Sequence, residues 1–524
     1  MCHLQQVHGA QGPLAVADQE NAKNDQDSGA TGKYFTTRKR NKVKRYVPTG
    51  RELWNLKEEG GETQQNRRVI AEQSSDVLDV LIIGAGWAGA TAAKTLINAG
   101  RTNIKVLEAR DYTGGRTHTV MESVWEGQED YPVDIGSQWI HGITGNPISQ
   151  VASANGISYR LTEYLQMIYN EGGAISSDEV SSLRGELYSG SDGFIPYTAV
   201  LQKTTEIDQS LQSAADQYVA SKSDPLTLYK RNVLKYFMDY IIGAEYAGSL
   251  DELSLFWWNS DEAFEGVDGF PQGGFSELFH AYAQGAVQDV IETKSRVTTI
   301  DTTGELVKVV YTDTATNQSK EVMAHKVLVT VPLGVLKKQS IGFTPALPEK
   351  TLTAISSVGM GLLNKVVMFW KDNNEIFWPK SIEWLGAIAT SNSIEIYNAY
   401  PVNGGKPVLV AFAYGNYAKE LEDTFGTDMA AYQTEMTNQA MTVLRSMFGN
   451  SIPDPMSTKV TQWGKDDLAY GSYSFNKVGM SQKAREDLCT PLQNNRIFFA
   501  GEACNNDYFG TTHGEWPSLL KIYF

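Results

Sequence analysis

The 524-residue sequence has little cysteine and no long apolar run, and each scarcity excludes a class of protein. The three cysteines, Cys2, Cys489 and Cys504, form neither a disulfide framework nor a metal-ligand spacing, so we expect structural thiols and a reducing compartment. The most membrane-like stretch, Val80 to Ala93, is shorter than the roughly 18 residues that span a bilayer. The start of the chain lacks a basic segment followed by an apolar one, so no secretory signal is expected.

Positive charge is scarce over most of the chain. The net charge is −16; residues 1–75 hold 12 Lys and Arg against 9 Asp and Glu, and the remainder holds 33 against 52. A body this acidic does not favour nucleic acid, although it attracts polycations; solubility is the plainer explanation. The basic run over residues 38–45 fits either a nuclear localisation signal or a solvated segment. We expect a cytoplasmic or nuclear protein.

Polarity and hydrophobic periodicity change along the chain and divide it into segments. Residues 1–75 are polar and without a sustained period, which predicts a disordered tail. An apolar strand over 77–83, a glycine-rich turn, a helix to about Asn98 and a strand over 104–108 predict a βαβ unit. Further elements are expected as strands over 326–331 and 496–500, and as helical stretches over 195–250 and 418–448.

The turn after the first strand carries the glycine pattern GAGWAG, residues 84–89. Gly84 permits the tight turn, Gly86 lets backbone approach a pyrophosphate, and Gly89 allows close packing of helix on strand. The helix N-terminus favours the anion. Glu108 follows Gly84 by 24 positions, at the end of the second strand, where a carboxylate accepts hydrogen bonds from ribose hydroxyls. Together these features predict a dinucleotide site.

Two further segments favour a flavin over a nicotinamide. Residues 108–117, EARDYTGGRT, add a glycine pair and an arginine that offer donors to phosphate oxygens. Residues 499–503 close a strand, and residues 510–514, GTTHG, are expected to start a helix. The N-terminus of that helix would stabilise negative charge on a reduced isoalloxazine ring.

These segments resemble those of the flavin-containing amine oxidases, and most of all the polyamine oxidases. The motifs occur in the family's order over about residues 76–514: GAGWAG, EARDYTGGRT, DIGSQWIHG, VTVPLGVLK, LLNKV, YGSYS, and FAGEA followed by GTTHG. The resemblance implies an α/β fold in which a Rossmann-type FAD-binding domain is interleaved with an α+β substrate-binding domain. The implied FAD-binding segments are 76–150, 265–345 and 465–524, and the substrate-binding segments are 151–264 and 346–464.

The resemblance also implies which residues hold the cofactor. The ADP half of FAD would be held by Gly84, Gly86, Gly89, Glu108, Arg110, Gly115 and Arg116, and Val297 would contact the adenine through its backbone. The flavin would be lined by Gly136, Ser137, Gln138, Trp139, Trp463, Glu502, Thr511 and Thr512. Core packing is the alternative for both tryptophans. Monoamine oxidases attach flavin through a cysteine near residues 466–475, where this chain has none, so non-covalent FAD is expected.

Three residues would carry chemistry. Lys365 is either a snorkelling surface lysine or, as the resemblance implies, a buried ammonium beside flavin N5 with a lowered pKa. His141 would bind the substrate amine or exchange its proton, with a structural role as the alternative. Tyr473 would form an aromatic wall that orients the amine. Thr511 replaces a second aromatic found in some relatives, which leaves a more polar wall. No metal site is expected.

The implied reaction is the FAD-dependent oxidation of polyamines (spermine, spermidine or acetylated forms) by oxygen. The neutral amine would give hydride to the flavin, and the imine would hydrolyse to an aldehyde and a shorter amine, with hydrogen peroxide as the other product. Activity should rise from neutral to mildly alkaline pH. The alternatives are a flavin-dependent histone-lysine demethylase, an L-amino acid oxidase, and a catalytically silent flavin-binding protein.

The end of the sequence departs from the family pattern. After GTTHG the family continues with a small residue and a long helix, whereas this chain reads Glu515-Trp516-Pro517-Ser518 and stops at Phe524. Pro517 disfavours a continuing helix. The final helix is therefore expected to be missing or altered, as in a fragment or an unusual splice product. Whether the chain retains FAD depends on this altered end.

Overall fold

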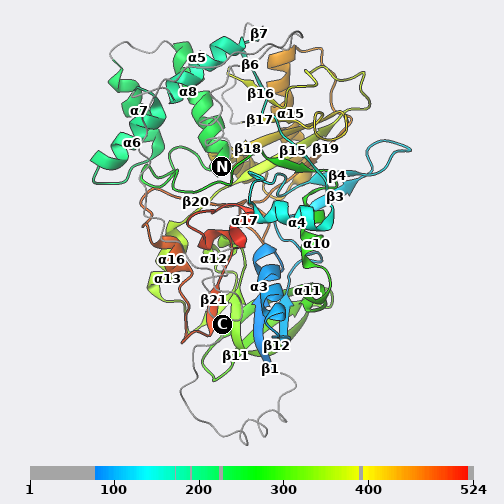
Figure 1. Cartoon of the computed structure of the whole chain (residues 1–524), viewed down its shortest axis with the longest axis vertical. Coiled ribbons are helices and arrows are strands. Elements are labelled where there is room, and N and C mark those ends of the chain that lie inside the picture. Colours follow the sequence, from blue (N-terminus) through cyan, green and yellow to red (C-terminus); the bar gives the residue numbers. More distant parts are fainter. Residues whose placement is uncertain (1–76, 171–172, 189–191, 223–227, 389–393, 517–524) are drawn as a thin grey trace, which may run out of the picture. The chain divides into compact units, whose positions relative to one another are not determined.

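The structure, a computed structural model, describes residues 77–516 except 171–172, 189–191, 223–227 and 389–393. The expected disordered tail, residues 1–75, and Pro517 lie outside the described residues. Two large sheets organise the described chain. In Figure 1 the strands β1, β11 and β12 lie on one side of the short helix α17, and β15 to β19 lie on the other.

The first sheet has eight strands in the order β13-β10-β11-β12-β1-β2-β9, with β21 also paired to β12. Its strands are β1 (Val77–Ile83), β2 (Ile104–Leu107), β9 (Ile291–Glu292), β10 (Ser295–Asp301), β11 (Val307–Asp313), β12 (Gln318–Val329), β13 (Gly342–Thr344) and β21 (Ile497–Phe499). β1 runs parallel to β2 and β12, and β12 runs parallel to β21. The predicted parallel strands therefore end together at one edge of this sheet.

The βαβ unit forms as the sequence predicts. Helix α3 (Trp87–Asn98) connects β1 to β2. It packs so closely on the turn after β1 that a Cβ on Gly89 would overlap the carbonyl oxygen of Gly84. The inner residues of β1, such as Leu81 and Ile82, are fully buried. A strand covered on both faces is apolar throughout, which is why the sequence alone locates this unit.

The second sheet has seven strands in the order β19-β15-β18-β17-β16-β6-β7. They are β6 (Gln166–Asn170), β7 (Gly173–Ala174), β15 (Leu363–Phe369), β16 (Trp384–Ala387), β17 (Ile394–Asn398), β18 (Val408–Tyr414) and β19 (Ser457–Val460). Residues of β18 alternate between two cores. Val408, Val410 and Phe412 belong to one core, and Leu409, Ala411 and Ala413 to the other.

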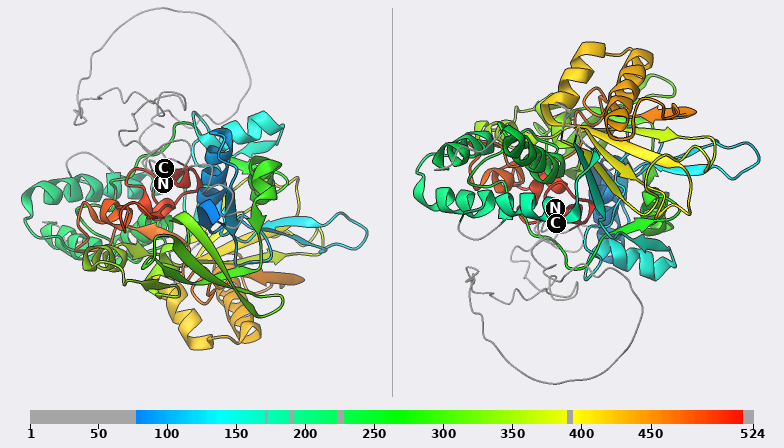
Figure 2. Two further views of the ribbon diagram at one scale, coloured as in Figure 1. Left: turned by 90° about the horizontal axis from the view of Figure 1, so that it is seen from below. Right: turned by 90° about the horizontal axis from the view of Figure 1, so that it is seen from above.

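Each of these cores contains a group of helices. The first group is α5 (Ser177–Tyr188), α6 (Phe194–Thr204), α7 (Leu211–Ser221), α8 (Leu228–Met238), the π-helix η1 (Asp239–Gly243) and α9 (Ala244–Tyr246). The second is α14 (Gly415–Phe425) and α15 (Met429–Phe448). Figure 2 shows them as separate green and golden layers. The helical stretches expected over 195–250 and 418–448 are thus confirmed, each as several helices.

Short elements complete the described chain. They are β3 (Thr119–Glu122), β4 (Tyr131–Asp134), α4 (Pro147–Asn155), β5 (Tyr159–Leu161), β8 (Gly269–Pro271), α10 (Phe275–Ala283), α11 (Ala286–Asp289), α12 (Leu333–Lys337), α13 (Glu349–Ser357), β14 (Gly359–Met360), β20 (Ser474–Phe475), α16 (Ala484–Leu488), η2 (Glu502–Cys504) and α17 (Thr512–Glu515). The helix expected at GTTHG is therefore a single turn. Within the described ranges no helix is both long and apolar enough to cross a membrane.

The expectation of free thiols is wrong for two of the three cysteines. Cys489 and Cys504 form a disulfide, with their Cα atoms 5.7 Å apart. The bond joins the residue after α16 to the end of η2. The chain leaves α16, passes through β21 and returns, so the pairing depends on that path and not on the spacing of the two cysteines.

Candidate functional site

A small cavity of about 90 Å³ lies where the parallel strands of the first sheet end. Its wall includes Ile83 and Leu107, the last residues of β1 and β2, and Thr330, which follows β12. Ligands of open α/β sheets bind at the carboxyl ends of the strands. The predicted residues that line this cavity are Gly84, Gly86, Glu108, Arg110, Gly115, Arg116 and Val297.

Glycine is required at the turn after β1. Gly84 has a φ of +103°, and a Cβ there would lie 2.7 Å from Oγ1 of Thr330. A Cβ on Gly115 would lie 3.7 Å from Cα of Gly86, so the two glycine loops approach each other. The turn therefore presents bare backbone to the cavity, which is what close approach of a diphosphate needs.

Glu108 joins the first glycine loop to the end of β2. Its carboxylate accepts hydrogen bonds from the backbone nitrogens of Ala85, at 2.7 Å, and Arg110, at 2.8 Å. Burial raises the pKa of Glu108, and these two N–H groups oppose the shift. The guanidinium of Arg110 turns to Asp466, 2.7 Å away. Val297 lies in β10 and is 6% exposed.

A larger cavity of about 240 Å³ opens beside the first. The predicted residues on its wall are Arg116, Gly136, Ser137, Gln138, Trp139, His141, Lys365, Trp463, Tyr473, Glu502, Thr511 and Thr512. The two cavities share Gly114, Arg116 and Glu515. Of the predicted site residues only Gly89 lines neither, because it packs α3 against the turn at Gly84. The described fold thus brings all these residues together.

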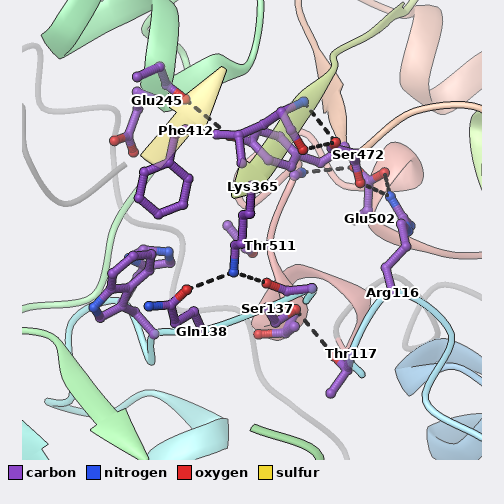
Figure 3. Close-up of a pocket in the computed structure, with 18 of the residues that line it drawn as sticks. Arg116, Thr117, Ser137, Gln138, Glu245, Lys365, Phe412, Ser472, Glu502 and Thr511 are labelled. Carbon is purple, nitrogen blue, oxygen red and sulfur yellow. Dashed lines mark hydrogen bonds and ion pairs between the residues drawn. The ribbon is translucent and has the colours of Figure 1, made fainter. Parts of the chain in front are cut away.

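Lys365 is buried and does not snorkel. Its Nζ donates to the carbonyl oxygens of Asp134 and Gly136, each at 2.8 Å. It also donates to Oε1 of Gln138 at 2.7 Å (Figure 3). The side chain comes from β15, and its Nζ lies 5.8 Å from the ring centroid of Phe412. Burial lowers the pKa of Lys365 to about 8, and the coulombic effect of Asp134 opposes the shift. The ammonium of Lys365 therefore loses its proton at a pH not far above neutral.

Glu502 and Arg116 form an ion pair at the junction of the cavities. Nη1 of Arg116 lies 3.0 Å from Oε1 of Glu502 and also donates to the carbonyl of Ser472 at 2.8 Å. Oε2 of Glu502 accepts from Oγ of Ser474 at 2.6 Å and from the backbone nitrogen of Gly510 at 2.9 Å. Burial works to raise the pKa of Glu502, but Arg116 and the hydrogen bonds lower it overall. Glu502 is therefore an ionised anchor.

His141 is oriented by a buried carboxylate. Its Nδ1 lies 2.8 Å from Oδ2 of Asp268, which is fully buried and also accepts from the hydroxyl of Tyr164. Oδ1 of Asp268 accepts from the backbone nitrogen of Gly142 at 2.8 Å. The His141 side chain is 37% exposed and lines the larger cavity. With Nδ1 turned to Asp268, the other ring nitrogen is the one available to a ligand.

Aromatic side chains form much of the wall. Trp139 packs edge-on to Tyr397, with ring centroids 5.1 Å apart, and lies 5.9 Å from Trp384. Nε1 of Trp463 donates to the carbonyl of Ile135 at 3.2 Å. The hydroxyl of Tyr473 donates to the carbonyl of Ala244 at 3.1 Å, which leaves the ring face on the cavity. An apolar wall of this kind excludes water and accommodates methylene chains.

Sequence reasoning missed four carboxylates on the same wall: Glu245, Asp268, Glu395 and Glu515. Glu395 lies inside the buried strand β17, and burial raises its pKa well above the usual range. A charged residue within the apolar run IEIY was a usable signal. Glu245 and Asp268 lie in loops and a helical turn with no such pattern. Figure 3 shows Glu245 beside Phe412, across the cavity from Gln138.

Thr511 and Thr512 begin the one-turn helix α17. Oγ1 of Thr511 accepts from the backbone nitrogen of Gly514 at 2.9 Å, which caps the turn. Nδ2 of Asn505 donates to the carbonyl of Gly514 at 2.9 Å. These contacts fix the helix end although the sequence departs from the family pattern at Glu515.

Comparison with known proteins assigns the family. The family model of flavin containing amine oxidoreductases matches residues 87–516. Polyamine oxidase 2 of Arabidopsis thaliana is 31% identical and covers 84% of this chain and 86% of its own length. Lysine-specific histone demethylase 1 homolog 1 of the same species is also 31% identical over 84% of this chain. This chain spans about half the length of that relative, 51%.

A solved structure has the same fold. A redesigned putrescine oxidase superposes with a TM-score of 0.62 over 84% of this chain and 97% of its own, at 18% identity. The expected fold, a Rossmann-type FAD-binding part interleaved with a substrate-binding part, is thereby confirmed. The chain belongs to the flavin containing amine oxidoreductases, and its cofactor is FAD.

Proposed function

We propose that the chain oxidises polyamines such as spermine, spermidine or their acetylated forms. The observation that carries this proposal is the pair of carboxylates, Glu245 and Glu395, on an aromatic cavity wall. A polyamine carries several cationic nitrogens along a methylene chain. Buried carboxylates pair with the nitrogens, and aromatic faces contact both the chain and the cations. Polyamine oxidases are also among the relatives at about 30% identity.

We further propose the residues that hold FAD. The glycine turns fit the group, since Gly86 and Gly115 line the smaller cavity and a Cβ on either would project into it, with no other atom closer than 3.7 Å. The ADP side would be held by Gly84, Gly86, Gly89, Glu108, Arg110, Gly115, Arg116 and Val297. The flavin side would be held by Gly136, Ser137, Gln138, Trp139, Trp463, Glu502, Thr511 and Thr512. Cys489 and Cys504 are bonded to each other, which supports non-covalent FAD.

In this proposal one part of the fold binds FAD and the other binds the amine. Segments 76–150, 265–345 and 465–524 would bind FAD, and segments 151–264 and 346–464 would bind the amine. Lys365, from the second sheet, reaches the loop at Gly136 and Gln138 and so bridges the two parts. The small-molecule amine and oxygen are the proposed partners, and nucleic acid is not among them.

The chain's own residues would prepare the amine. His141, held at Nδ1 by Asp268, would take the proton of the substrate ammonium at its other ring nitrogen. The walls of Trp139 and Tyr473 would orient the neutral amine and exclude water. FAD, when bound, supplies the redox chemistry: it accepts a hydride and passes two electrons to oxygen. The cation on Lys365 would stabilise negative charge that develops on oxygen.

The test is a comparison of kcat/KM for spermine, a monoamine and a dimethyl-lysine histone peptide. Spermine should be preferred, and Glu395→Gln should raise its KM by about tenfold, the equivalent of ~1.4 kcal/mol, with less effect on the monoamine. The matched control is Glu321→Gln, whose carboxylate is 65% exposed beside Lys308. A preference for the peptide would establish the demethylase alternative, and a preference for the monoamine would reject a polycation site.

A further inference from the structure

The carboxylate of Glu515 lies at the N-terminus of helix α3. Its Oε2 accepts from the backbone nitrogen of Ala88 at 3.0 Å, across 427 residues of sequence. Its Oε1 lies 3.4 Å from Nη2 of Arg116. A Cβ on Gly86 would lie 3.8 Å from Oε2, so the carboxylate stands directly over the glycine turn. Its side chain is 16% exposed.

This is the place where a dinucleotide's diphosphate is expected. The first N–H groups of a helix that follows a glycine turn, together with a nearby arginine, attract an anion. No side chain of its own loop caps α3, whose N-cap is Gly86. Glu515 therefore makes, from the far end of the described chain, the contact that a phosphate oxygen of FAD would make.

The position of Glu515 is held by its neighbours. Thr511 caps the turn that carries it, and the ring of Trp516 packs on Tyr282 with centroids 4.6 Å apart. Glu515 lines both cavities, at the junction that FAD must cross to reach from Val297 to Lys365. Two anions in this junction would compete for Ala88 and Arg116 and would repel each other.

We propose that Glu515 is an internal competitor of the FAD diphosphate: its carboxylate occupies the anion position at α3 and must leave before the cofactor binds. The same residue that caps α3 then weakens FAD binding. The proposal concerns binding alone and does not depend on which amine is oxidised.

The test is a titration of the full chain, stripped of flavin, with FAD, ADP and riboflavin, followed by fluorescence quenching or calorimetry. Glu515→Gln keeps the size and one acceptor but removes the charge. It should bind FAD about tenfold more tightly or better, because the diphosphate then no longer meets a like charge in the site. ADP should gain similarly, whereas riboflavin, which has no diphosphate, should bind as it does to the unchanged protein.

A second variant and a control make the result decisive. Glu515→Ala should also bind FAD more tightly while its flavin-free form melts at a lower temperature, since α3 loses its cap. Glu321→Gln changes the net charge equally at a remote surface and should leave all three affinities unchanged. The proposal is overturned if neither Glu515 variant binds FAD more tightly, or if riboflavin gains as much as FAD.

Discussion

The two cavities are built in different ways. The smaller one is centred on two consecutive loops of a single sheet, around Gly84 and Gly115, and more distant residues such as Thr330 and Glu515 complete its wall. The larger one collects His141, Glu245, Lys365 and Tyr473 from segments hundreds of residues apart. The first depends on backbone shape, so glycines and one carboxylate suffice. The second depends on side chains that only the tertiary fold brings together. Substitutions should therefore affect the two cavities through different properties, cofactor binding in one and reaction rate in the other.

The largest effect should follow from Lys365→Met in the larger cavity. Loss of a buried proton donor and cation should slow the oxidation of reduced flavin by roughly 10²–10⁴-fold, the usual range for such groups, while FAD is retained. In the unchanged enzyme this rate should fall as pH rises through about 8, where Lys365 loses its proton, and the variant should lack that limb. Stopped-flow mixing with oxygen measures both.

A control separates this from a general loss of charge. Lys371→Met removes an exposed lysine two residues beyond the same strand and should leave the rate unchanged. If Lys365→Met oxidises as fast as the unchanged enzyme, then the bridge between the two parts of the fold is structural and the assignment of Lys365 fails.

Beside the smaller cavity, Gly89→Ala should act on stability and cofactor content. The added Cβ would overlap the carbonyl of Gly84, so α3 must shift from β1. Overpacking of this kind costs about 1–3 kcal/mol of unfolding free energy, and the purified protein should hold less FAD. Denaturant unfolding and the visible spectrum measure these effects. Gly304→Ala, whose added Cβ meets nothing closer than 3.7 Å, is the control and should behave as the unchanged protein.

A third prediction concerns the pair of His141 and Asp268. Asp268→Asn should slow flavin reduction by about tenfold, ~1.4 kcal/mol, because the histidine is no longer held by a charged acceptor. If Asp268 acts through His141, the substitution should add nothing in a His141→Ala background, as a double-mutant cycle would measure. Additive effects would show that Asp268 serves the substrate or the fold on its own.

The smallest effect should be the loss of the cap on α3. Glu515→Ala should lower the unfolding free energy of the flavin-free protein by about 1 kcal/mol, the usual contribution of an N-terminal cap. With FAD bound, the difference should shrink, because the diphosphate would supply the missing acceptor. Thermal melts with and without FAD measure this. An equal loss in both states would contradict the shared position of carboxylate and phosphate.

The sequence predicts the glycine turns and Glu108 on the wall of the smaller cavity, since their geometry is local, but it does not predict Thr330, Asp467 or Glu515 on the same wall. β1 appears at its predicted bounds, and Gly84 has the positive φ that the turn pattern requires. Lys365 was also predictable, although its three acceptors were not. Asp268 and the partner of Glu515 were beyond reach because their contacts join residues that are 127 and 427 positions apart in the sequence. The disulfide between Cys489 and Cys504 was missed although the two residues are only 15 positions apart, because the path of the chain through β21 brings them together.

The glycine pattern in the sequence thus locates the loops proposed to bind the cofactor's phosphates. Which amine the larger cavity accepts depends on side chains that only the tertiary fold brings together. Glu395 lies between the two cases. Its place in a buried apolar strand marks it as unusual, but only the fold shows that it faces the same cavity as Tyr473. The choice of substrate therefore rests on side chains whose place in the cavity only the three-dimensional structure shows.

The most direct test of the proposed activity is anaerobic mixing of the FAD-loaded protein with spermine while its visible flavin band is followed. Spermine should bleach the band rapidly, faster than a monoamine at equal concentration, and bleaching should speed up from neutral to mildly alkaline pH as the amine loses its proton. A flavin band that no polyamine bleaches would contradict the account and leave a flavin-binding protein without amine oxidase activity on these substrates.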